Sequence, residues 1–286
     1  MWEKINKFNR SHSIIAALFL SIFFMITLTA SVVLLMNIGM IETMNNTDPV
    51  YLLFLTIVQI TLSCVAILLM RKMQVFNIND FKFINMGKCF SLGWYNFVYI
   101  AGAVFFMVIQ IPENSLIMPS VAHLTITILF PFLGTALFEE LVFRGLVLKI
   151  LLVTMGDSKR GIFKACIISA VIFGIVHIVN LIHAADTLAV IAQVIYASFL
   201  GLFYAVLFLR TKTLWIPIIL HGLTNLSIQI FNAIIFIDNV PTQTEPNIIV
   251  ALIPLIFAIP FIIVGLVLLK KVTPDDIGLL MGKRTK

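Results

Sequence analysis

Three strongly apolar stretches of the chain carry ionisable or amide side chains at helical spacing. They read FEELVFRG, with Glu139, Glu140 and Arg144; FGIVH, with Phe173 and His177; and LHGLTN, with His221 and Asn225. Side chains four residues apart share one face of a helix, so each stretch presents a narrow polar stripe. An ionisable group at membrane depth costs several kcal/mol, so each stripe is a hypothesis of function.

The residue types suggest hydrolysis. Glu140 can pair with Arg144 one turn later, whereas Glu139 points about 100° away around the helix and can face another partner. A buried carboxylate without its own counter-charge can act as a general base and then as a general acid. Glu139 and His177 could therefore deprotonate a water, while His221 and Asn225 donate hydrogen bonds to a developing oxyanion. The simplest target of this set is a peptide bond.

Other chemistries are less well supported. The chain has no plausible G-x-S-x-G elbow, no cysteine beside a histidine motif and no H-E-x-x-H helix. Glu139, His177 and His221 could instead hold a divalent metal, and the sequence does not separate a metal-bound water from a glutamate-activated one. Simpler roles also exist. Glu140–Arg144 could be a structural pair, His177 a core histidine, and His221–Asn225 a link between helices.

The elements that position these residues must be membrane helices. Of 286 residues, 61% are hydrophobic and 11% charged, with a mean hydropathy of +1.10. Soluble domains are about 45–50% apolar and about 25% charged. This composition excludes a disordered chain, a disulfide scaffold and a soluble nucleic-acid binder. The net charge of +6 then indicates topology rather than an anionic partner.

The hydropathy pattern predicts an all-α, polytopic membrane protein with about eight transmembrane helices. A bilayer core needs about 20 apolar residues per helix. We predict a single membrane domain over 1–286 with the catalytic core at 120–235, and a first span that is retained rather than cleaved. The eight predicted spans are 13–36, 50–70, 92–111, 121–150, 162–183, 188–209, 214–236 and 248–269.

Basic residues divide between the two sides of this arrangement very unevenly. Every Lys and Arg except Arg144 falls on the side that holds both termini, which predicts that both termini are cytoplasmic. His12 and Asp80 are expected to be solvated there, and His123 and His183 to lie near a water interface. Counted from the span ends, Glu139 lies near mid-membrane and His221 in the cytoplasmic half. The opposite loops carry only acidic charges: Glu42, Asp48, Glu113, Asp186, Asp238 and Glu245.

The three motifs resemble those of a known family. E-E-x-x-x-R at 139–144, F-x-x-x-H at 173–177 and H-x-x-x-N at 221–225 occur in the order and on the spans of the CAAX protease and bacteriocin-processing family, also called CPBP or Abi. The approach to the third motif, LWIPIILHGLTN, is similar as well. This resemblance covers roughly 120–235 and implies an eight-helix intramembrane endopeptidase around a conical catalytic cavity that opens toward the cytoplasm.

The resemblance also implies roles for individual residues. Glu139 and His177 would activate the water, and His221 and Asn225 would stabilise the oxyanion. The supporting residues would be Glu140, Arg144, which holds Glu140 ionised, and Phe173. Family members have been described both as metalloproteases and as glutamate proteases. We favour the glutamate type without a cofactor, because an Asn amide is a poor metal ligand and a good oxyanion donor; a divalent metal is the alternative.

Substrate and setting are predicted from the resemblance and from composition. We expect a peptide or membrane-protein substrate, cut near its C-terminus or the membrane boundary, in a bacterial plasma membrane, with bacteriocin processing as one family role. The partners are this substrate and the lipid bilayer, not nucleic acid. A proton-coupled transporter is the main alternative, although its repeated polar set is missing from the first three spans. A non-catalytic membrane scaffold is the second.

Overall fold

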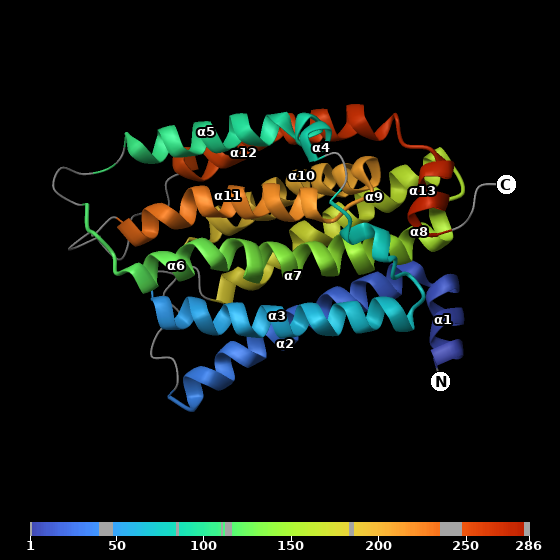
Figure 1. Ribbon diagram of the computed structural model, residues 1–286, viewed down its shortest axis with the longest axis horizontal. Coiled ribbons are helices and arrows are strands. Elements are labelled where there is room, and N and C mark those ends of the chain that lie inside the picture. Colours follow the sequence, from blue (N-terminus) through green and yellow to red (C-terminus); the bar gives the residue numbers. More distant parts are fainter. Residues whose placement is uncertain are drawn as a thin grey trace.

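The computed structural model describes residues 2–39, 48–83, 86–109, 111, 116–182, 186–234 and 248–282, and every regular element within them is a helix (Figure 1). The all-α prediction is therefore confirmed. The helices are α1 Trp2–Ser11, α2 Ser13–Asn37, α3 Pro49–Lys72, η1 Ile78–Phe81, α4 Met86–Leu92, α5 Trp94–Val108, α6 Val121–Leu129, η2 Phe130–Ala136, α7 Leu137–Glu140, η3 Leu141–Leu148, α8 Lys149–Met155, α9 Lys159–Ile175, η4 Val176–Ile182, α10 Thr187–Thr211, α11 Trp215–Ile234, α12 Ile248–Leu269 and α13 Pro274–Leu280.

Each of the eight predicted spans coincides with an apolar helical segment. In the described part of the chain, six segments are long and apolar enough to cross a membrane: 13–37, 49–72, 121–155, 159–182, 187–211 and 252–269. The other two, at 94–108 and 215–231, are shorter apolar helices. The protein is thus a multi-pass membrane protein, but the count of eight full spans is not confirmed.

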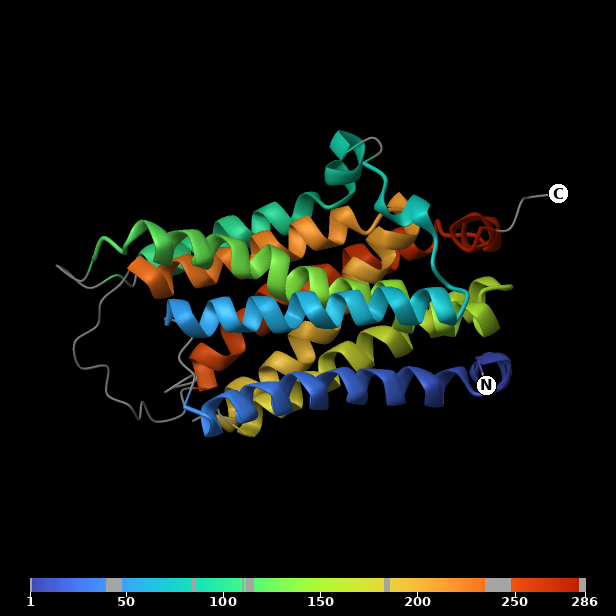
Figure 2. The same cartoon turned by 60° about the horizontal axis from the view of Figure 1, so that its bottom comes forward.

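The long helices run along the same axis and form an elongated bundle (Figures 1 and 2). The short helices α1 and α13 lie together at one end of the bundle. This end also holds the loop between α8 and α9 and the start of α9, where Lys159, Arg160 and Lys164 are exposed. The arrangement agrees with the prediction that the basic segments share one side, while the orientation of that side in a cell stays a prediction.

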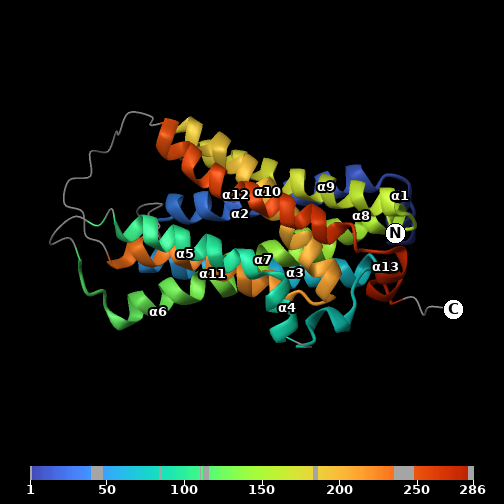
Figure 3. The same ribbon diagram turned by 90° about the horizontal axis from the view of Figure 1, so that it is seen from above.

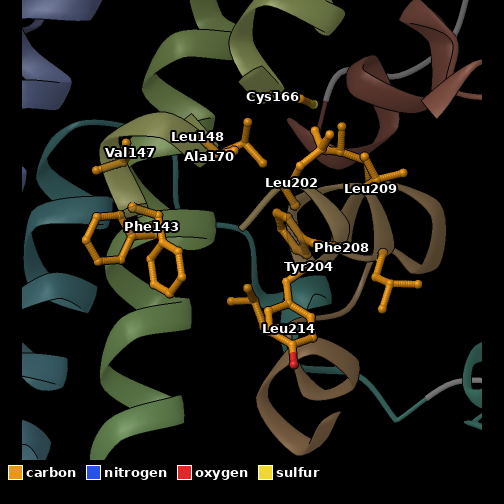
Figure 4. Packing of buried hydrophobic residues seen from close by; sticks show 14 of the residues in the cluster. Phe143, Val147, Leu148, Cys166, Ala170, Leu202, Tyr204, Phe208, Leu209 and Leu214 are labelled. Atoms are coloured by element: carbon orange, nitrogen blue, oxygen red, sulfur yellow. The ribbon is translucent and has the colours of Figure 1, made fainter. Parts of the chain in front are cut away.

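Helix α10 forms the centre of the core. It packs along both α9 and α12, and residues 201–209 of α10 are all buried (Figure 3). Figure 4 shows the contact with the 121–155 segment, where Phe143 and Val147 face Leu202 and Phe208 across the cluster. Close approach needs small residues, because a Cβ on Gly174 would overlap the α10 backbone at Val194. The core therefore fixes α9 and α10 tightly against each other.

The 121–155 segment is one continuous helix that changes its winding. It passes from α6 into the π-helical turn η2, through the short α7, and into a second π-helical segment, η3. Pro131 in η2 has no amide hydrogen and cannot continue an α-helical hydrogen-bond ladder. Widened π turns are typical of functional positions in helices. The two glutamates lie in α7, between the two widened stretches.

Candidate active site

Glu140 is the centre of a buried chain of charged groups. Its Oε2 lies 3.0 Å from Arg144 Nε, one turn later on the same helix, and its Oε1 lies 2.8 Å from Nδ1 of His221 on α11. Glu140 and Arg144 are almost fully inaccessible, at 0% and 1% exposure. The predicted intrahelical pair is present, and it extends to a histidine of another helix. Glu140 therefore fixes the orientation of the His221 ring.

Arg144 is enclosed by aromatic rings and backbone. Its guanidinium lies 4.4 Å from the centre of the Phe173 ring and 5.8 Å from that of Tyr204, and Nη2 donates a 3.3 Å hydrogen bond to the Gly201 carbonyl. Cations are stabilised over aromatic faces, most strongly where water is excluded. These contacts hold the positive charge beside Glu140.

Glu139 approaches the opposite nitrogen of the same histidine. Its Oε2 is 3.8 Å from His221 Nε2, too far for a direct hydrogen bond but suitable for a bridging water. The two adjacent glutamates thus face the two nitrogens of one imidazole ring. Helix α11 can come this close because Gly222 has no Cβ, which would otherwise overlap the Phe132 ring of η2.

His177 lies where α9 tightens into the 3₁₀ segment η4. Its Nδ1 is 2.8 Å from the Phe173 carbonyl oxygen, one turn earlier. Because a carbonyl only accepts, a proton must be on Nδ1, and in the neutral ring Nε2 is then an acceptor. The Phe173 ring lies edge-on to His177 and to His221, with centroids 5.1 and 6.1 Å away. Phe173 therefore spaces the two histidines.

A chamber of about 270 Å³ joins part of the predicted set. Its wall is mostly apolar and is formed by α5, α9, α10, α11 and α12. His177, His221, Asn225 and Phe173 line it, whereas Glu139 does not. The two described side chains Glu139 and His177 share no hydrogen bond or ion pair. The structure therefore brings Glu139 to His221, and His177 to the chamber that His221 and Asn225 also face.

Three further polar residues, Tyr204, Asn96 and Thr224, lie beside His221, and the sequence motifs did not point to them. The Tyr204 ring stacks on the His221 ring, with centroids 5.2 Å apart and planes 21° apart. The Tyr204 hydroxyl donates a 2.9 Å hydrogen bond to Asn96 Oδ1 and lies 3.2 Å from Thr224 Oγ1. Asn96 in turn donates to Thr224 and to the Leu220 carbonyl, at 3.0 and 3.1 Å. Asn96 and Tyr204 are uncharged polar residues within apolar helices, which is a signal that a search for ionisable groups overlooks.

One sequence expectation is wrong. Asp80 was expected to be solvated, but it forms a buried ion pair with Lys149, and the two side chains have 1% and 0% exposure. The segment that carries Asp80 is hydrogen-bonded to Lys149 and to the Leu214 amide, and both charged groups are removed from solvent there. Burial raises the pKa of Asp80 to about 6, against the opposing effects of the Lys149 charge and hydrogen bond.

The remaining histidines have no described role in the site. His12 is exposed, as expected, and stacks on Phe8. His123 is partly buried in α6, and its Nε2 has no hydrogen-bond partner among the described residues. Several residues of the topology prediction lie outside the described residues: Glu42, Glu113, His183, Asp238, Glu245, Lys283, Arg284 and Lys286.

The metal alternative concerns Glu139, His177 and His221. In the described part of the chain, no group of three or more His, Cys, Asp or Glu side chains is arranged to hold a metal ion, and this includes Glu139, His177 and His221. Nδ1 of His177 contacts the Phe173 carbonyl and Nδ1 of His221 contacts Glu140, which leaves Nε2 of each ring available; metal-ligating histidines are commonly oriented in the same way. The choice between a glutamate-activated and a metal-bound water therefore stays a prediction.

Known proteins resemble this chain over its core. Residues 123–227 match the family model described as Type II CAAX prenyl endopeptidase Rce1-like. "Putative membrane peptidase YdiL" of Bacillus subtilis (strain 168) is 29% identical over 130 residues, which cover 44% of this chain. The match covers 47% of that protein, so this chain spans about half the length of its curated relative. No solved structure matches. The family resemblance expected from the three motifs is confirmed over residues 123–227.

Proposed function

We propose that this chain, whose core at 123–227 is of the Rce1-like family, is an intramembrane endopeptidase of the glutamate type. The single observation that carries the proposal is the placement of His221, which lies between two glutamates and also lines an apolar chamber. A purely structural ion pair needs neither a second carboxylate nor a cavity. The combination supplies a base, an oriented histidine and room for a substrate.

Hydrolysis begins with a water beside Glu139. Glu139 takes a proton from this water, and the water oxygen attacks the carbonyl carbon of the scissile peptide bond. His177, whose Nδ1 is held by Phe173, offers Nε2 as a second acceptor that positions the water. Glu139 is the primary base, because it has the only described carboxylate of the site without an ion-pair partner within hydrogen-bonding distance.

The tetrahedral intermediate needs donors for its oxyanion. In its protonated form, His221 donates Nδ1–H to Glu140 and keeps Nε2–H for the oxyanion, and the Asn225 amide provides the second donor. Collapse breaks the C–N bond, and the proton on Glu139 passes to the departing amine. The products are a new carboxyl terminus and a new amino terminus, with no covalent enzyme intermediate.

The chamber suggests the class of substrate. Its mostly apolar wall suits a hydrophobic peptide segment. The scissile bond of this segment would lie at the polar edge formed by His177, His221 and Asn225. We therefore propose a peptide or membrane protein that is cut near its C-terminus or at the membrane boundary. Both termini of the enzyme would lie on the cytoplasmic side of a bacterial plasma membrane.

A cleavage assay with matched variants tests the proposal. The purified protein in liposomes is offered a library of hydrophobic peptides with free C-termini, and products are identified by mass spectrometry. Glu139→Gln should lower kcat by about 10²- to 10⁴-fold, the usual contribution of a general base. Glu3→Gln, at an exposed glutamate of α1, is the matched control. Equal cleavage by Glu139→Gln and wild type would contradict the assignment.

Two further arms separate the alternatives. Loss of cleavage on adding a chelator, restored by one divalent ion, would contradict the glutamate type. Proton-gradient-dependent uptake of a solute by the same liposomes, without any cleavage, would support the carrier. Cleavage that survives the chelator and requires Glu139 is the expected result.

A further inference from the structure

A second hollow lies at the end of the bundle that carries the basic loops. It is a groove of about 660 Å³ between the first turns of α9 and the last turns of α12. Both helices pack along α10, and the groove lies where α9 and α12 run beside each other (Figure 3). The groove does not include any residue of the candidate active site. Its lining residues are Lys159, Arg160, Ile162, Phe163, Lys164, Leu266, Leu269, Lys270 and Val272.

Four of these nine side chains are cationic. Lys159, Arg160, Lys164 and Lys270 are all exposed, and none of them forms an ion pair with a carboxylate in the described part of the chain. Asp157, the nearest acidic residue in sequence, lines a different hollow beside α13. The positive charge in the groove is therefore uncompensated by the neighbouring helices.

The rest of the groove is apolar. Ile162, Leu269 and Val272 form a buried floor, and Phe163 is 46% exposed at its side. Leu266 extends the apolar lining along α12, away from the basic end. The groove thus has cations at one end and hydrocarbon along its length. A water-soluble anion would not need the apolar floor, and a neutral lipid would not need the cluster of cations. The groove therefore fits neither of these ligands.

The position of the groove adds to the match. Basic residues at a helix end mark the membrane boundary, where lipid phosphates lie. The first-turn amides of α9 add partial positive charge at the same end. Basic pockets between transmembrane helices on the cytoplasmic side are suited to acidic lipid head groups.

We propose that this groove binds an anionic phospholipid, with its phosphate against the four cations and one acyl chain along Leu266 and Phe163. The proposal does not depend on proteolysis. It concerns a resident lipid that bridges the start of α9, the helix leading to His177, and the end of α12.

Native mass spectrometry of the detergent-purified protein tests the proposal directly. Phosphatidylglycerol and phosphatidylcholine with identical acyl chains are titrated separately, and glycerol phosphate serves as the free head group. The test variant is Arg160→Gln/Lys164→Gln/Lys270→Gln. The matched control, Lys7→Gln/Lys72→Gln/Lys82→Gln, removes three exposed charges that lie outside the groove. Circular dichroism verifies that each variant is folded.

We expect one molecule of phosphatidylglycerol to bind well above phosphatidylcholine, and glycerol phosphate not to bind. Each basic residue near a membrane surface contributes about fivefold to the affinity for acidic lipid, so the groove variant should lose about a hundredfold. The control variant should bind like wild type. Equal losses in the two variants, equal binding of the two lipids, or binding of glycerol phosphate as tight as that of the lipid would each overturn the proposal.

Discussion

Two ion pairs are fully buried in the described part of the chain, and they have different surroundings. Glu140–Arg144 forms within one helix and continues to His221, which lines a chamber. Asp80–Lys149 joins a loop to the far end of the same long helix, and neither partner lines any of the described hollows. Burial of either pair costs desolvation free energy, but only Glu140–Arg144 has a third titratable group, His221, beside a cavity.

The second pair, Asp80–Lys149, attaches a loop to the helices. Lys149 also donates a 3.0 Å bond to the Val75 carbonyl, and the Asp80 carbonyl accepts from the Leu214 amide at 2.7 Å. Next to it, the Trp215 indole donates to the Phe81 carbonyl at 2.8 Å. The loop is therefore fastened both to α8 and to the start of α11. Burial of charge alone does not identify a catalytic site, since the neighbours decide whether the charge positions a reactant or a backbone.

The largest effect should follow from Arg144→Met. This change leaves the Glu140 carboxylate buried without a counter-charge, which costs about 3–5 kcal/mol of unfolding free energy. The His221 ring loses its fixed carboxylate partner as well, so cleavage should vanish. Denaturant unfolding in detergent and the peptide assay measure the two losses. A folded and active Arg144→Met protein would contradict the role given to this pair.

Lys149→Met should be milder and should separate stability from catalysis. Asp80 can take up a proton, because burial already raises its pKa to about 6, so the cost near that pH should be only about 2 kcal/mol. Cleavage per folded molecule should stay within about threefold of wild type. Lys72→Met, at an exposed position, is the matched control. Complete loss of cleavage in a folded Lys149→Met protein would show that the second pair is not merely mechanical.

Tyr204→Phe should have a smaller effect that is confined to the first region. The change removes the hydroxyl bonded to Asn96 and costs about 1 kcal/mol of stability. The stacked ring remains but is less firmly placed against His221, so kcat should fall roughly tenfold with KM unchanged. Tyr95→Phe, which removes a 2.9 Å bond to the Phe257 carbonyl, is the control. Equal kinetic losses in both variants would indicate a general packing effect.

The last prediction is a pH dependence of stability at the second pair. The folded state holds a proton on Asp80 up to about pH 6, whereas the unfolded chain releases it near its usual 3.8. The Asp80 contribution to the unfolding free energy therefore falls as pH rises through this interval. Denaturant unfolding at several pH values should show this fall in wild type and in the exposed-site control Asp157→Asn, but not in Asp80→Asn. An unchanged pH dependence in Asp80→Asn would contradict the prediction.

Much of the architecture could be predicted from local pattern. Each apolar run that is long enough to need a bilayer became an apolar helix, because hydropathy acts on consecutive residues. The i,i+4 spacing of Glu140 and Arg144 likewise predicted their pair, since both residues belong to one helix. Asp80 and Lys149 could not be paired in this way, because 69 residues separate them and the short segment that carries Asp80 has no periodic signal.

What the sequence by itself determined is the set of helices and the polar stripe on each of them, because both depend only on neighbouring residues. Only the tertiary structure decided how these stripes meet. Glu139 lies sixteen residues before the end of α8, whereas His221 lies only six residues after the start of α11. They reach the same level because the 121–155 helix extends beyond α11 at the basic end (Figure 1). That offset comes from packing between helices, which span counting cannot give, and it sets Glu139 and Glu140 on opposite nitrogens of one histidine.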